Sequence, residues 1–245
     1  MALLKVAGYE QECDVVGNVT SKRYFGLDGK PATNSLGYVE ERMQYTGKNK
    51  LIQEEYFDAN GHRCLGSNRV AGKRVEYDKV GNGIKESYMG IDGEPVPCRD
   101  AYYEKRMTYY KWNQMASESY WDRHGNFFKV SANYGEIGHL NLYDSRGKKY
   151  VTAYFTLDGN NKVTCIRVRV YNPDDNRMVT FIQKNGLDGV WKDETRMPME
   201  LYDSLVVAFS EEIKKWHRVQ VANGKSVIND SQPKNPCAAW AVGNE

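Results

Sequence analysis

Three arginines that recur at a fixed interval are the first candidates for binding chemistry. Arg42, Arg74 and Arg106 stand 32 residues apart, each inside a short segment of alternating character. Guanidinium groups arranged in a row can pair with an acidic protein surface or with a phosphate backbone. Neighbouring glutamates, such as Glu40 and Glu104, can neutralise that row and leave an ordinary solvated sheet face. We take the three arginines as a candidate binding stripe.

A second recurring feature is a column of tyrosines, which could stack against sugar rings or bases. Its members stand 32 or 34 residues apart, at Tyr24, Tyr56, Tyr88, Tyr120 and Tyr154. Burying one such ring removes about 150–250 Å² from water, which is a gain that a thin sheet needs for stability. This gain favours the tyrosines as core residues, and stacking on carbohydrate is the alternative.

Residues that could bind metals or catalyse reactions are present, but they form no recognised motif. Calcium needs six to eight oxygen ligands, whereas each turn supplies one or two from Asp or Asn. The turn residues in question are Asp28, Asn60, Asp92 and Asp158. The histidines match neither H-E-x-x-H nor an activated nucleophile, and they stand at His62, His124, His139 and His217. We predict no catalytic residue, no metal site and no cofactor, with an enzyme of unrecognised type as a remaining alternative.

The arginines, the tyrosines and the turn residues lie on a repeat with a period of about 32 residues. The phrase "YFGLDGKP" at 24–31 returns as "YFDANGHR" at 56–63 and as "YMGIDGEP" at 88–95. Glycine and asparagine in each copy can supply the positive φ of a tight turn, and the flanking segments alternate with period two. Five copies predict an all-β fold, an antiparallel β-hairpin meander of about ten strands that ends near Phe181.

The first turn of each unit, such as "YDKVGN" at 77–82, sets the pairing of its two strands. A simple register across that turn places Val75 opposite Ile84. The same register places Lys73 opposite Glu86, a pair of opposite charges worth about 0.2–1 kcal/mol.

After the repeats the sequence predicts one amphipathic helix, over residues 198–217. Its apolar positions follow helical spacing, at Leu201, Leu205, Phe209, Ile213 and Trp216. Phe209 and Trp216 are the largest of these side chains. They either anchor the helix on the sheet or, if the helix is a tethered appendage, form part of a binding surface. We therefore expect a repeat sheet over residues 1–181, with the helix and an irregular tail over 182–245.

The repeats resemble bacterial tandem β-hairpin repeats of the YD/RHS type, and also MORN-variant and WG repeats. The resemblance is carried by "YD-x-x-GN" elements at 77–82 and 143–147 and by "YFDANG" at 56–61, and it covers roughly residues 9–181. It implies an interaction or scaffold module and transfers no catalytic residue.

Charge and the opening segment limit the choice of partner. The chain has 34 Lys and Arg against 32 Asp and Glu, a net charge of +2, which argues against wholesale attraction to nucleic acid or to an anionic membrane. The opening residues contain no signal-like or membrane-spanning run, so we expect a soluble, cytoplasmic protein. We predict a non-enzymatic scaffold that binds another macromolecule, most readily a protein, and the alternative is a carbohydrate-binding module.

Overall fold

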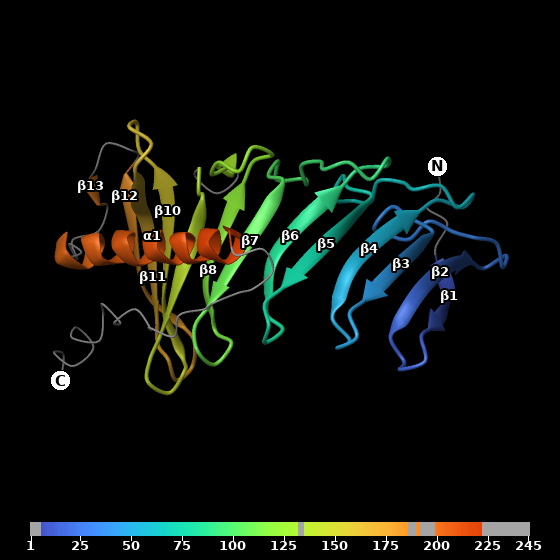
Figure 1. Cartoon of the computed structure of the whole chain (residues 1–245), viewed down its shortest axis with the longest axis horizontal. Coiled ribbons are helices and arrows are strands. Elements are labelled where there is room, and N and C mark those ends of the chain that lie inside the picture. Colours follow the sequence, from blue (N-terminus) through green and yellow to red (C-terminus); the bar gives the residue numbers. More distant parts are fainter. Residues whose placement is uncertain (1–5, 132–134, 186–189, 192–198, 222–245) are drawn as a thin grey trace. The chain divides into compact units, whose positions relative to one another are not determined.

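A computed structural model describes residues 6–131, 135–185, 190–191 and 199–221 of the chain (Figure 1). Side chains at 179–185, 190–191, 199–201 and 216–221 lie outside that description. The chain divides into two compact units. Unit 1 comprises Met1–Lys105 with Trp121–Asn126, and unit 2 comprises Arg106–Tyr120 with Phe127–Glu245.

The described residues form thirteen strands and one helix, which confirms the predicted all-β hairpin meander with a C-terminal helix. Within each unit, strands that follow one another in the chain pair side by side and antiparallel. The strands of unit 1 are β1 (Val6–Cys13), β2 (Val19–Gly26), β3 (Glu40–Tyr45), β4 (Leu51–Phe57), β5 (Gly72–Tyr77) and β6 (Gly83–Met89). Two strands have residues in both units, β7 (Glu104–Tyr109) and β8 (Met115–Trp121). Unit 2 continues with β9 (Gly138–Tyr143), β10 (Lys149–Leu157), β11 (Val163–Tyr171), β12 (Met178–Asn185), β13 (Val190–Trp191) and α1 (Met199–Val221).

The hairpin turns use a side chain to close a five-residue loop. Asp78 Oδ1 accepts hydrogen bonds from the backbone N–H groups of Val80 at 3.0 Å and Asn82 at 2.8 Å. Gly81 has φ +95°, a conformation that glycine adopts without steric cost. The copy that lacks glycine reaches the same kind of backbone through Trp112 and Asn113, with φ 83° and 58°. The predicted turn chemistry is therefore present even where its sequence signal is weak.

The simple strand register is wrong by two residues. Val75 lies opposite Glu86, and Lys73 lies opposite Tyr88. The cause is the turn, because its loop closes between Tyr77 and Gly83 and adds a bulge next to Tyr77. Lys73 instead forms an ion pair with Glu54 of the preceding hairpin, with 3.2 Å between Nζ and Oε2.

The link from one hairpin to the next contains a further tight turn that the repeat phrase does not reveal. Between β2 and β3, the N–H of Asn34 donates to the carbonyl of Tyr38, and the corresponding bond between β4 and β5 runs from Gly66 to Val70. This turn brings Tyr38 under the tyrosine column, where its ring stacks on Tyr56 with 4.5 Å between centroids. Tyr24, Tyr38 and Tyr56 therefore pack on one another. Within the predicted column Tyr88 and Tyr120 are buried, as the core interpretation requires, whereas Tyr24, Tyr56 and Tyr154 are half-buried.

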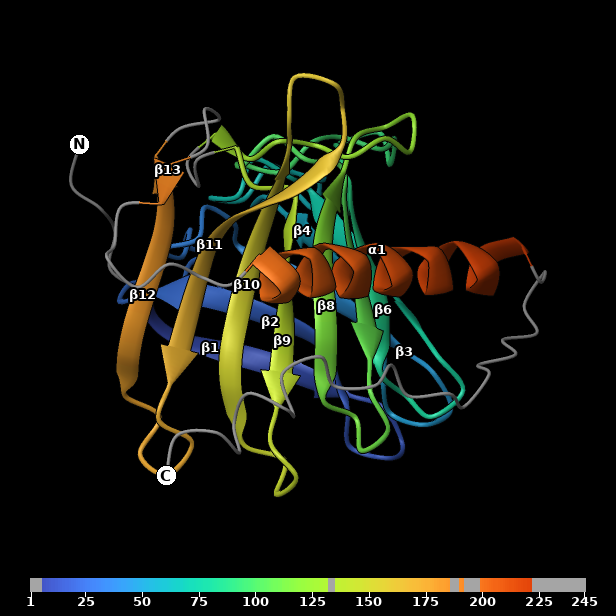
Figure 2. The ribbon, with the colours of Figure 1, turned by 90° about the vertical axis from the view of Figure 1, so that its left-hand side faces the viewer.

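The helix covers one face of the sheet in unit 2, where it lies across the strands (Figure 2). Phe209 is fully buried and stacks on Phe155 of β10, with ring centroids 4.2 Å apart and planes 5° from parallel. Gly138 of β9 lets the helix approach closely, because an added Cβ would lie 3.1 Å from the Phe209 ring. Leu205 is also buried. The amphipathic pattern thus identified both the helix and the face that it buries.

Candidate functional site

A polar hollow of about 750 Å³ lies on unit 1 across β1, β2 and β3. Charged residues of both signs line it together with hydroxyl and amide side chains. The lining residues are Glu10, Gln11, Glu12, Thr20, Ser21, Arg23, Glu40 and Arg42. Such a surface can donate and accept hydrogen bonds with the same ligand.

Antiparallel register brings these residues together from three strands. Glu10 lies opposite Arg23, and Arg23 lies in turn opposite Glu40. Ser21 lies opposite Arg42 in the neighbouring row. Because side chains alternate along a strand, these groups share one face of the sheet, and the tyrosine column occupies the other face.

Arg42 is held in place by two contacts, and its carboxylate partner is held by a third. Its Nε donates to Glu40 Oε1 at 2.6 Å, and its guanidinium lies 3.9 Å from the centroid of the Phe57 ring. The Ser21 hydroxyl also donates to Glu40, at 3.3 Å. Since 48% of the Arg42 side chain remains exposed, part of the guanidinium is available to a ligand. A positioned arginine loses less conformational freedom on binding than a mobile one.

Arg23 is the feature of the hollow that sequence reasoning missed. Its Nε is buried, and the described residues provide that atom with no hydrogen-bond partner. Leaving a buried donor unpaired costs about 1–3 kcal/mol, and a turn of the Arg23 side chain into the hollow that it lines would let a ligand oxygen pair with this donor. Arg23 does not belong to a row of repeating arginines, because the next copy has Glu55 at the equivalent position. That departure from the repeat was the available signal.

The predicted stripe of three equivalent exposed arginines does not extend to Arg106. Arg42 lines the hollow, and Arg74 is exposed with its Nε donating to Gln53 Oε1 at 2.9 Å. Arg106 is only 7% exposed. Binding by Arg42 and Arg74 stays a prediction.

Of the two helix residues proposed for binding, the structure describes the side chain of Phe209 but not that of Trp216. Phe209 is enclosed against Phe155 and presents no surface to a partner. Trp216 belongs to α1, but its side chain lies outside the described residues, as does the tail with Trp240.

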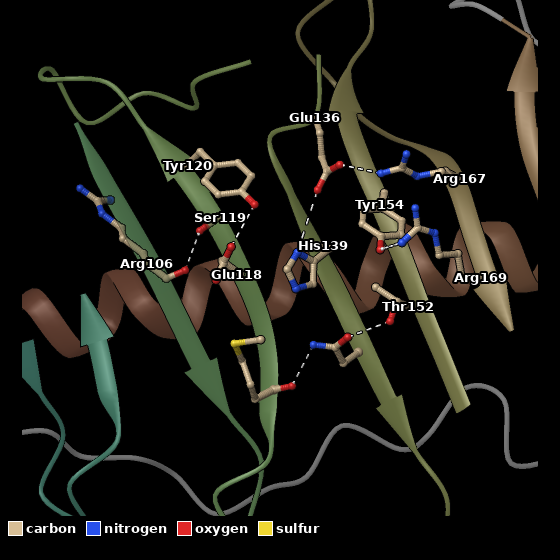
Figure 3. A network of polar contacts seen from close by, with 12 residues as sticks. Arg106, Glu118, Ser119, Tyr120, Glu136, His139, Thr152, Tyr154, Arg167 and Arg169 are labelled. Atoms are coloured by element: carbon tan, nitrogen blue, oxygen red, sulfur yellow. Dashed lines mark hydrogen bonds and ion pairs between the residues drawn. The ribbon is translucent and has the colours of Figure 1, made fainter. Parts of the chain in front are cut away.

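A second polar cluster occupies the face of unit 2 opposite α1 (Figure 3). Glu136 is 2% exposed, and its carboxylate accepts a hydrogen bond from Arg167 at 2.9 Å. Burial raises the pKa of Glu136 to about 7, while the Arg167 charge acts in the opposite direction. The Tyr154 ring lies under the Arg167 guanidinium at 4.0 Å, and Tyr154 accepts a hydrogen bond from Arg169 at 3.0 Å. The cluster can hold a proton near neutral pH, but its acid is enclosed by protein.

The groups considered for catalysis or metal binding are dispersed. Within the described ranges, no cluster of three or more His, Cys, Asp or Glu residues could hold a metal ion. The turn carboxylates bond to backbone instead, and Asp58 accepts from Asn60 and His62 at 2.8 and 2.9 Å. The hydrogen bond from the backbone N–H of His62 is the main cause of the lowered pKa of Asp58. His139 Nδ1 lies 4.0 Å from Glu136, and the His217 side chain falls outside the described part.

No protein-family model matches this chain, and no curated protein matches its sequence. Solved structures with some similarity include a crystal structure of TcdB2–TccC3, with a TM-score of 0.34 and 12% identity over 75% of this chain. A second is TcdB2–TccC3 without its hypervariable C-terminal region, with a TM-score of 0.33 and 16% identity over 64% of this chain. The matched parts are 10% and 9% of those chains, so this chain spans about a tenth of their length. Similarity at this level assigns neither a family nor a function.

The described part of the chain contains no helix of the length and apolar character that crossing a membrane requires.

Proposed function

We propose that the protein is a non-enzymatic repeat scaffold that binds another protein through the hollow on β1, β2 and β3. The buried, unpartnered Nε of Arg23 is the observation that carries this proposal. A backbone carbonyl or a carboxylate of a bound polypeptide would satisfy it if the Arg23 side chain, which lines the hollow, turned its Nε toward the ligand, and Arg42 supplies a second guanidinium within the same lining.

The lining favours a polypeptide over a carbohydrate. Its eight residues include no aromatic ring, whereas sugar sites rely on ring stacking. On the opposite face, Tyr38 and Tyr88 are buried, and their hydroxyls donate to Glu41 at 2.9 Å and Glu86 at 2.6 Å. Buried rings with bonded hydroxyls serve the fold, so the carbohydrate alternative gains less support than protein binding.

The test compares two double variants in affinity purification from the native host with quantitative mass spectrometry. Arg23→Gln with Arg42→Gln removes both guanidiniums from the hollow. Lys48→Gln with Lys79→Gln removes the same charge from exposed turns of unit 1 and serves as the matched control.

We expect a protein that the wild type and the control retain and that the arginine variant loses. With that partner purified, affinity should fall as salt rises, because charge-assisted contacts are screened. Equal capture of the same proteins by both double variants, with circular dichroism showing intact folds, would remove the hollow from the binding surface.

A further inference from the structure

The charges that line the hollow are separated by sign. Its positive side consists of Arg23 on β2 and Arg42 on β3, and its negative side consists of Glu10 and Glu12 on β1. The third acid of the lining, Glu40, is already engaged, because it is only 7% exposed and pairs with Arg42 at 2.6 Å. The charge that a ligand meets therefore runs from negative on β1 to positive on β2 and β3.

The two acids of β1 are open to a positively charged group. Glu10 lies opposite Arg23, Glu12 lies opposite Ser21, and both glutamates are exposed. Among the described residues, neither forms an ion pair with an arginine of the hollow. A cation can thus approach both carboxylates without displacing a described ion pair.

The distance between the two charged sides fits one spacing in an extended peptide. Neighbouring strands lie about 4.8 Å apart, so the midpoint between the strands of Arg23 and Arg42 is about 7 Å from β1. Side chains two residues apart in an extended peptide point the same way and also stand about 7 Å apart. Side chains of adjacent residues point in opposite directions, and only one of them can face the hollow.

We propose that the hollow binds an extended segment of the partner protein in which one residue separates a lysine or arginine from an aspartate or glutamate. The basic side chain lies against Glu10 and Glu12. The carboxylate lies beside Arg42 and accepts from Arg23 Nε once that side chain turns into the hollow. This inference rests on the proposed function, because it specifies the chemistry of the polypeptide that the hollow binds.

A segment with only one sign of charge fits the hollow less well. A purely acidic segment would place its additional carboxylates near Glu10 and Glu12, and a purely basic one would place its cations near Arg23 and Arg42. Like charges brought together in this way oppose binding.

Two peptides of the same composition, with acetylated and amidated ends, test the spacing. GSKSESG has one residue between lysine and glutamate, and in GSKESSG the two are adjacent. In a nuclear magnetic resonance titration of the full chain, we expect GSKSESG to shift amide resonances of β1, β2 and β3. We expect it to bind at least about tenfold more tightly than GSKESSG, and less tightly as salt rises. Equal affinities for the two peptides would overturn the proposal.

A double-mutant cycle tests which side chain meets the lysine. Glu10→Gln with Glu12→Gln should weaken GSKSESG but leave the affinity for GSQSESG unchanged, because that peptide has no lysine to lose its partner. Asp92→Asn with Glu94→Gln is the matched control, because it removes the same charge from an exposed turn of unit 1 and should alter neither affinity. If the Glu10 and Glu12 variant changes both affinities equally, the lysine does not lie against these acids and the proposal fails.

The native partner separates this inference from the proposed function. Loss of the partner by the Glu10 and Glu12 variant as well as by the Arg23 and Arg42 variant would support both. If only the arginine variant loses the partner, the hollow binds a protein but the assigned chemistry is wrong. If the arginine variant retains the partner, the proposed function itself is refuted.

Discussion

Replacing Phe209 by alanine should destabilise unit 2 strongly. The ring is fully buried and lies parallel to Phe155, so the substitution removes both its burial and the ring contact. Burial of an aromatic ring removes about 150–250 Å² from water, worth at most about 4–6 kcal/mol. Because the site is backed by the closely packed backbone at Gly138, little collapse into the cavity is possible. We expect a loss of about 3–5 kcal/mol in the free energy of unfolding.

The assay is urea denaturation followed by circular dichroism at 222 nm, which reports on α1. Val207→Ala is the matched control, because Val207 lies on the same helix and is 60% exposed. The control should change the free energy of unfolding by less than about 0.5 kcal/mol. A loss within about 1 kcal/mol of the control for Phe209→Ala would show that α1 does not depend on this contact.

Two further predictions concern a buried acid and a turn. Because the pKa of Glu136 is raised to about 7 from 4.5, the folded protein keeps a proton that the unfolded chain releases. The free energy of unfolding should therefore fall as pH rises through that window, by up to about 3 kcal/mol, and Glu136→Gln should remove the slope. Urea denaturation of the wild type and of Glu136→Gln at several pH values between 5 and 8 measures this slope, and His139→Gln is added to both proteins to remove the neighbouring histidine. Equal dependence of the free energy of unfolding on pH with and without Glu136→Gln would refute the prediction. Gly81→Val should lower stability by about 1–3 kcal/mol because its φ is +95°. In calorimetry, Gly47→Val is the control, since Gly47 has open space and an ordinary φ, and equal melting temperatures would contradict the assigned turn.

Much of the fold could be predicted because it is set by local chemistry. Turn residues such as Asp78 and Gly81 act within five residues of chain, so their spacing alone locates the hairpins. The helix was equally accessible, because the four-residue spacing of Leu205, Phe209 and Ile213 places all three on the buried face of α1.

Features that depend on register could not be predicted in the same way. The bulge beside Tyr77 shifts every later pair of its hairpin, and the sequence carries no separate signal for it. Glu136 and Arg167 are 31 residues apart in the sequence, so their contact follows from the pairing of β9, β10 and β11. The burial of Arg106 is likewise a property of packing, because the arginine keeps the repeat position of its exposed counterparts.

The candidate site lies where the first repeat differs from the second at two positions that form an ion pair in the second. In the second copy, Glu55 forms an ion pair with Arg63 of the same repeat. In the first copy the equivalent residues are Arg23 and Pro31, and the positions correspond structurally because Pro31 bridges to Phe25 as Arg63 bridges to Phe57. The exchange reverses the charge at one position and removes the pairing group at the other. A repeat built only for stability gains nothing from a buried guanidinium nitrogen without an acceptor. The same exchange gives the first repeat a hydrogen-bond donor that a bound polypeptide could satisfy.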